Sequence, residues 1–257
     1  MKDQKSNTNI RLRREMEIQD GVVKNYEHLR YHLSYARTFH DWAFNEIASR
    51  ADLKNITGWI LDDGCGVGQL ANYLPETALL CGLDISYEML RKASIRMLNV
   101  IQGSSTNLPI ASEEFELIFA NSLIHHLPDP EQGISEIHRI LKPGGQVILI
   151  DTNRSLINAI PRAIAYRRDN FSIDHVNFKS KPYVRMLANY FKIDQIEYWG
   201  YLAYPFGFPD MMGPIRKINF PPRLVRGLIA ADKVISTIPL LRTQSWWIAI
   251  SAHKEEI

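Results

Sequence analysis

The amino-acid sequence predicts an α/β protein with a seven-stranded, mostly parallel sheet that helices cover on both faces. Between Trp59 and Asp151 short apolar runs alternate with amphipathic segments, which is typical of repeated strand–helix units. Two more runs with strand character follow at Lys192–Trp199 and Ser245–His253. The chain of 257 residues is long enough for one large domain of this class or two small ones.

Five strands are expected in the alternating region, each a short apolar run: Trp59–Asp62, Leu79–Leu83, Asn99–Gln102, Phe115–Ala120 and Gln146–Asp151. The helices expected around them are amphipathic: Gln69–Leu74, Tyr87–Met97, Pro130–Leu141 and, later in the chain, Ser180–Tyr190. The run Lys142-Pro143-Gly144-Gly145 should end the third of these helices, because a cation in the last turn followed by Pro and Gly is a typical helix stop.

Two regions lie outside this alternation. A segment from Asp20 to Ala51 has a helical pattern, and we expect residues 1–55 to form a helical lid on a domain that spans residues 56–257. The basic residues before it are expected to belong to a solvated, frayed tail: Lys2, Lys5, Arg11, Arg13 and Arg14. An apolar insertion rich in Pro and Gly, residues 204–243, separates the last two strands.

Composition excludes several classes of protein. The formal net charge is +2 with acids and bases nearly balanced, so no nucleic-acid partner is expected. Cys65 and Cys81 show neither CxxC spacing nor a pattern of histidine partners, so neither a disulfide scaffold nor a metal site is expected. The sequence shows no signal-peptide core and no apolar run of membrane-spanning length, which favours a cytoplasmic location.

The run from Ile60 to Gly68 predicts a binding loop for a nucleotide-like cofactor. An apolar strand is followed by three glycines at alternate positions and then by a helical pattern. Such glycines allow a sharp turn and let a bulky ligand lie against the backbone. The spacing is GxGxG, with Gln69 where a dinucleotide fingerprint would place its third glycine, and the P-loop pattern is absent.

Four ordered motifs identify the cofactor by resemblance: ILDDGCGVG, LCGLDIS, LPIASEEFELIFANSLIHHLPDP and EIHRILKPGGQVILID. Together they resemble the class I S-adenosylmethionine-dependent methyltransferases, in particular the small-molecule, type-11-like group. The resemblance implies a Rossmann-like fold and S-adenosyl-L-methionine as the cofactor. It also implies a set of cofactor-binding residues: Asp62, Gly64, Cys65, Gly66, Gly68, Asp84, Ile85, Ser104, Ser105 and Asn121.

Individual roles follow from strand ends and from the resemblance. Asp84 closes the second strand, where α/β sheets bind ligands, so its carboxylate can accept the ribose hydroxyls; the alternative is that it caps the next helix. The resemblance places Asp62 at the methionine end of the cofactor. Asp63 replaces a usually apolar residue and must face water or find a partner. Ser104 stands where the family often has an adenine-binding Asp.

The acceptor side is less specified. A general base is needed only when the acceptor is a hydroxyl or another weak acid. His126 is the main candidate, because in the similar phosphoethanolamine methyltransferases a His at its position works beside an N-terminal Tyr. Tyr26 and Tyr31 supply such tyrosines here. His125 is a weaker catalytic candidate, and His175 resembles another acceptor-side position.

Specificity is expected to depend on the N-terminal helices and the insertion. Within the insertion apolar residues recur at helical spacing: Leu224, Leu228, Ala231, Ile235 and Ile238. They form either a lid helix on the sheet or, through residues 221–239, a weak contact with a membrane surface. The expected function is transfer of a methyl group to a small-molecule acceptor, of apolar or lipid-like kind in the more specific form, by a monomer or homodimer. The alternatives are a methyltransferase of RNA or protein and a non-catalytic cofactor-binding protein. Enzymes that methylate the exocyclic amines of bases have Pro-Pro-Tyr or Pro-Pro-Phe after the position of Asn121, and its absence here counts against a DNA base as the acceptor.

Overall fold

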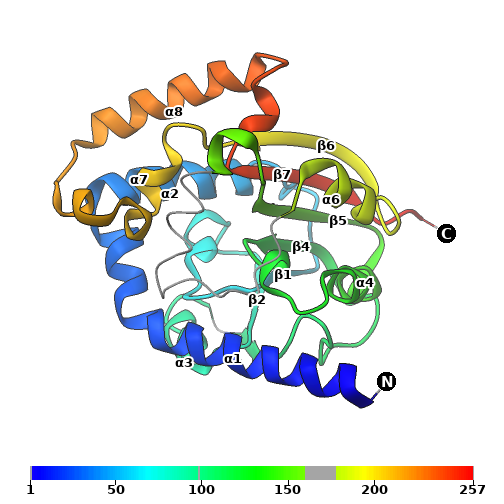
Figure 1. Cartoon of the computed structure of the whole chain (residues 1–257). Helices are drawn as coiled ribbons and strands as arrows, with labels where there is room; N and C mark the ends of the chain where they lie inside the picture. Colours follow the sequence, from blue (N-terminus) through cyan, green and yellow to red (C-terminus); the bar gives the residue numbers. More distant parts are fainter. Residues whose placement is uncertain (1, 98, 160–177, 257) are drawn as a thin grey trace.

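The structure is a computed structural model that describes residues 2–97, 99–159 and 178–256 (Figure 1). Its sheet contains seven strands in the order β3-β2-β1-β4-β5-β7-β6. Neighbours from β3 to β5 pair in parallel, and β7 pairs antiparallel with both β5 and β6. The strands are β1 Trp59–Asp63, β2 Leu79–Asp84, β3 Asn99–Gln102, β4 Phe115–Asn121, β5 Leu141–Thr152, β6 Lys192–Trp199 and β7 Trp247–His253. The expected seven-stranded α/β fold is confirmed.

Helices cover both faces of this sheet (Figure 1). The longer ones are α1 Lys2–Glu27, α2 Ser34–Ala48, α3 Tyr87–Ala93, α4 Pro130–Ile140, α6 Ser180–Leu187 and α8 Pro222–Thr237. The short helical segments are η1 His28–His32, η2 Gln69–Tyr73, η3 Ile124–His126, α7 Tyr204–Gly207, η4 Pro209–Lys217 and η5 Arg242–Gln244. None of the helices in the described ranges has the length and apolar character that crossing a membrane requires.

The alternation of side chains along the central strands builds two cores. On β4, Leu117 and Phe119 pack with α2, α3 and α8, whereas Ile118 and Ala120 face α4 and α6 on the other side. Because both faces are covered, the central strands are almost continuously apolar. Helix α2 is part of the first core through residues such as Phe39 and Ile47, so the second half of the expected lid packs on the sheet itself.

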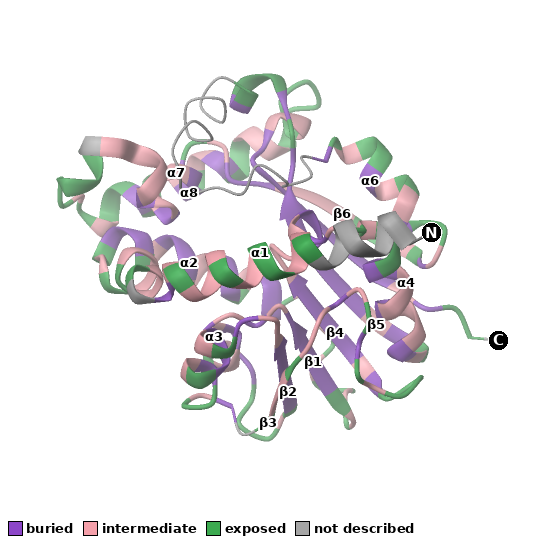
Figure 2. Ribbon diagram, turned by 60° about the horizontal axis from the view of Figure 1, so that its bottom comes forward, coloured by how far each residue is buried: buried purple, intermediate pink, exposed green. Residues whose placement is uncertain are grey.

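The expectation of a frayed basic tail is wrong. Residues 2–27 form one helix, α1, which crosses the sheet at the carboxyl ends of the strands (Figure 2). Polar contacts fix it there: the Arg11 guanidinium donates to the carbonyl of Pro128 at 3.0 Å, and Glu27 forms ion pairs with Lys92 and Arg96. These tertiary contacts stabilise a helix whose own sequence carries little apolar periodicity.

Several boundaries also differ from expectation. The segment after the glycine loop is a single 3₁₀ stretch, and the next helix ends at Ala93. Helix α4 ends at Ile140, one residue before the expected end. The run Lys142-Pro143-Gly144-Gly145 does not form a separate turn after it, because it belongs to β5, which begins at Leu141.

On α8 the buried side is Val225, Ile229 and Asp232, and Leu224 and Ile238 from the expected apolar face are exposed. The Asp232 carboxylate accepts the backbone N–H groups of Tyr201, Leu202 and Ala203, at 2.9, 2.7 and 3.1 Å, and this sets the rotation of the helix.

Candidate active site

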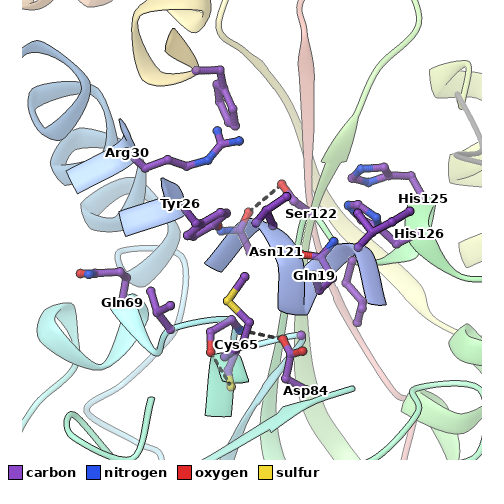
Figure 3. A pocket seen from close by; sticks show the side chains of 18 of the residues that line it. Gln19, Tyr26, Arg30, Cys65, Gln69, Asp84, Asn121, Ser122, His125 and His126 are labelled. Atoms are coloured by element: carbon purple, nitrogen blue, oxygen red, sulfur yellow. Dashed lines mark hydrogen bonds between the residues drawn. The ribbon is translucent and has the colours of Figure 1, made fainter. Parts of the chain in front are cut away.

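A cavity of about 560 Å³ lies at the carboxyl ends of the parallel strands, beneath α1. The glycine loop and the ends of β1, β2 and β4 form one part of its wall, and η1, α2 and the residues around Phe208 form another. One face of α1 closes it, with residues at helical spacing: Leu12, Glu15, Gln19, Val22 and Tyr26. In Figure 3, Asp84 and Cys65 lie at one end, Arg30 at the other, and His125 and His126 at the side.

The glycine loop presents backbone to this cavity. Gly64 and Gly66 have φ of +76° and +52°, which L side chains rarely adopt. A Cβ added at Gly66 would meet nothing within 4 Å, so the space above this residue is open for a ligand. Gly68 does not line the cavity; a Cβ there would lie 3.1 Å from the Cα of Ala93, so this glycine allows α3 to approach the loop.

Asp84 lies at the end of β2 as expected. Its Oδ2 accepts the N–H of Gly66 and its Oδ1 the N–H of Ser86, both at 2.9 Å, so the carboxylate is held in one orientation beside the loop. The side chain of Ser86 accepts from the N–H of Met89 and is the N-cap of α3. Asp84 is therefore available to a ligand, and burial raises its pKa.

Asp62 and Asp63 point to opposite faces of the sheet, as neighbours on a strand must. Asp62 lines the cavity, and its carboxyl has no hydrogen-bond partner in the described part of the chain. Burial, with the nearby charges of Asp63 and Asp84, raises the pKa of Asp62 to about 8. Asp63 is fully buried; Ser105 Oγ donates to its Oδ1 at 2.7 Å, while Oδ2 has no partner within the described ranges. Burial raises the pKa of Asp63 to about 7.

The remaining expected cofactor residues also line the cavity: Cys65, Ile85, Ser104, Ser105 and Asn121. The hydroxyl of Ser104 is 2.9 Å from the hydroxyl of Thr106. Ser105 was expected to face the cofactor, but its hydroxyl is engaged by Asp63. This pair provides the partner that a buried Asp63 needs.

Both histidines of the expected acceptor region hold carboxylates. His125 Nδ1–H donates to Asp151 Oδ1 at 2.6 Å, and Asp151 Oδ2 accepts the backbone N–H of His125 at 3.1 Å. His126 Nδ1–H donates to Glu15 Oε1 of α1 at 2.8 Å. In a neutral ring with the proton on Nδ1, the basic lone pair is on Nε2.

Asp151 and Glu15 were not singled out from the sequence. Asp151 is the last residue but one of β5, which pairs in parallel with β4, and the strand-end rule that selected Asp84 applies to it equally.

Aromatic side chains line the part of the cavity around Arg30. Most come from the two expected specificity regions, and the last two come from the expected final strand: Tyr26, Tyr31, His40, Phe44, Tyr204, Phe208, Trp246 and Trp247. His40 donates from Nε2 to the carbonyl of Gly207 at 2.8 Å, and burial lowers its pKa to about 3, so its ring is neutral. Tyr26 and Tyr31 line this cavity, and His175 lies outside the described residues.

These features fit S-adenosylmethionine. Asp62 offers a carboxyl without a partner to a ligand ammonium group, Asp84 offers an oriented carboxylate to ribose hydroxyls, and Gly66 leaves space between them.

Comparisons with known proteins agree with this fit. The family profile described as a methyltransferase domain matches residues 61–149. The chain is similar to a demethylmenaquinone methyltransferase of Lactococcus lactis, with 26% identity over 72% of this chain and 75% of that protein. It is 36% identical to a malonyl-[acyl-carrier protein] O-methyltransferase of Hahella chejuensis, but over only 35% of this chain and 34% of that protein.

Among solved structures, an S-adenosylmethionine-dependent methyltransferase of Thermotoga maritima has the same fold, with a TM-score of 0.63, 16% identity and coverage of 94% of this chain and 100% of that one. The motifs, the sheet order and the sequence relatives lead to one conclusion. The chain carries a methyltransferase domain over residues 61–149, and its motifs and fold resemble those of S-adenosylmethionine-dependent methyltransferases that act on small molecules.

Proposed function

We propose that this protein methylates a small molecule with an apolar, ring-bearing body, bound in the aromatic part of the cavity. The observation that carries the proposal is that one continuous cavity joins the glycine loop to a wall of aromatic side chains. Methyl transfer is an in-line displacement, so holding donor and acceptor in contact supplies most of what the reaction needs. We also propose that residues 1–55 act as the cap, since α1 and η1 close this cavity.

The cofactor supplies an electrophilic methyl group carried by a sulfonium. Asp62 would pair with its ammonium group, Asp84 would accept its ribose hydroxyls, and Ser104 would lie beside its adenine. The backbone at Gly64, Cys65 and Gly66 would form the surface beneath it.

His126 is the proposed general base for an acceptor that loses a proton. Glu15 holds its Nδ1–H, which directs the Nε2 lone pair to proton transfer and stabilises the imidazolium that forms. Asp151 orients His125 in the same way, and the two rings lie 4.1 Å apart between centroids. The imidazole of His126 can therefore accept one acceptor proton at Nε2.

Among the relatives, the ring-bearing substrate named for the Lactococcus lactis enzyme suits aromatic walls better than the acyl-carrier protein named for the Hahella chejuensis enzyme. Flat rings pack well against aromatic faces, whereas a carrier protein requires an open docking surface around a narrow entrance. We therefore propose an acceptor of the first kind.

The test measures release of S-adenosylhomocysteine across pools of ring-bearing and aliphatic acceptors. His126→Ala should lower kcat by about a hundredfold or more and leave S-adenosylmethionine affinity within about twofold, because the base acts on the acceptor. His253→Ala, which changes an exposed histidine paired with Asp194 on the far strand, is the matched control. Turnover by His126→Ala at the wild-type rate would rule out this role for His126, and no turnover with any ring-bearing pool would rule out the acceptor class.

A further inference from the structure

Arg30 and Asp210 form an ion pair inside the cavity that the methyltransferase chemistry above does not use. Arg30 belongs to η1 and Asp210 to η4, so the pair joins the N-terminal helices to the insertion. Arg30 Nη2 lies 3.4 Å from Asp210 Oδ2, and the two side chains are only 14% and 16% exposed. Both residues line the cavity, and Figure 3 shows Arg30 at the end opposite Asp84.

One polar atom of each side chain in this pair lacks a hydrogen-bond partner among the described residues. Within the described ranges, Arg30 Nη1 and Asp210 Oδ1 are buried and have no hydrogen-bond partner. A bidentate arginine–carboxylate pair would use both atoms, but here a single contact joins the groups. Buried donors and acceptors without partners are unfavourable, and native proteins rarely keep them unless a ligand or an ordered water completes them.

The guanidinium is also fixed in position. Its carbon lies 4.2 Å from the centroid of the Phe208 ring and 5.1 Å from that of Tyr26. Aromatic faces on a guanidinium restrict its rotation and leave its edge for hydrogen bonding. The unpartnered Nη1 of Arg30 therefore lies among aromatic side chains, whose faces suit a flat ring.

We propose that the Arg30–Asp210 pair binds a hydroxyl group on an aromatic acceptor. A hydroxyl is the simple group that both accepts, from Arg30 Nη1, and donates, to Asp210 Oδ1. The two side-chain charges compensate each other, so a carboxylate or an ammonium in the same place would leave a net charge buried. The substrate class is thus a neutral hydroxyarene, which rests on the proposed function and makes it more specific.

The experiment measures binding without turnover, with S-adenosylhomocysteine at saturation and equilibrium dialysis of three probes: 1-naphthol, naphthalene and 1-naphthoate. Wild-type protein should bind 1-naphthol about tenfold or more tightly than naphthalene, and 1-naphthoate more weakly than 1-naphthol. Arg30→Met should reduce the preference for 1-naphthol over naphthalene to about twofold or less while naphthalene affinity changes little. Lys217→Met, which removes an exposed cation from the same η4 segment, should retain the wild-type preference.

Asp210→Asn provides a second variant that keeps the shape of the side chain. It leaves the Arg30 charge uncompensated, so the selectivity should move toward 1-naphthoate. Equal preference for 1-naphthol in wild type and Arg30→Met would overturn the proposal, and so would tighter binding of 1-naphthoate than of 1-naphthol by the wild type. The affinity of the wild type for S-adenosylhomocysteine, measured in parallel, distinguishes failure of the proposed function from failure of this inference. If the wild type does not bind S-adenosylhomocysteine, the proposed function is refuted. If it binds S-adenosylhomocysteine but does not prefer 1-naphthol over naphthalene, only this inference is refuted.

Discussion

Asp63 should contribute to a loss of stability as the pH rises, and Asp63→Asn should remove that contribution while the contribution of Asp62 remains. The carboxyl is fully buried, and its pKa is about 7 in the folded protein against an ordinary value of 3.8. Between these values the folded state holds a proton that the unfolded chain has released, so stability falls by about 1.4 kcal/mol per pH unit. Over the whole window this amounts to about 4 kcal/mol.

The assay is urea denaturation followed by circular dichroism at pH 5 and pH 8. From pH 5 to pH 8 the stability of Asp63→Asn relative to wild type should rise by about 3 kcal/mol, since most of the titration lies in that range. Asn keeps an oxygen that can accept from Ser105 Oγ, so the two proteins should differ by only about 1 kcal/mol at pH 5. Glu76→Gln, at an exposed carboxyl, is the control and should follow wild type. Parallel losses in wild type and Asp63→Asn would refute the reasoning.

Three further predictions concern the cofactor side and the insertion. S-adenosylhomocysteine should bind more tightly as the pH rises from 6 to 8, by up to about tenfold per pH unit, because Asp62 must release a proton to pair with an ammonium group. Calorimetry in two buffers should detect the released proton, and an affinity that does not change with pH would contradict the prediction. Gly66→Ala should weaken cofactor binding and change the melting temperature little. Gly68→Ala, whose Cβ would lie 3.1 Å from the Cα of Ala93, should lower the melting temperature and change cofactor binding little. Calorimetry and thermal denaturation measure the two effects, and the opposite assignment of effects to variants would contradict the prediction. A membrane contact through residues 221–239 and the adjoining turn predicts that Leu240→Ser, at a side chain that is 88% exposed, reduces co-sedimentation with anionic vesicles. Leu79→Ser, at an exposed leucine on β2, is the control and should not reduce it. Equal co-sedimentation of the two variants would exclude this contact.

Strand ends were the most predictable part of the site. The rule that ligands bind at the carboxyl ends of parallel strands selected Asp62 and Asp84 from sequence, and both line the cavity. The same rule would have selected Asp151, which lay at the end of an expected strand. The bounds of β3 and β6 agree with expectation, and a glycine, Gly103 or Gly200, follows each run.

Features that depend on contacts between distant segments could not be predicted. Helix α1 is held by ion pairs and a carbonyl contact with residues that follow much later in the chain, so its own hydrophobic pattern gave no signal. The rotation of α8 depends on Asp232 and the N–H groups after β6, a contact that a helical periodicity does not reveal. Arg30 and Asp210 are 180 residues apart, and nothing local in either segment indicates the other.

The five-residue π-helix His28–His32 contributes consecutive residues to the part of the cavity that is proposed to bind the acceptor. Leu29, Arg30 and Tyr31 are consecutive and all line the cavity, while α1 before them covers the cofactor side and α2 after them belongs to the core. On the proposed function, a substitution of Leu29 or Arg30 would change which molecule is accepted without altering the glycine loop. On the proposed function, this turn is one place, together with the insertion and the last strand, where a change of sequence would alter acceptor specificity.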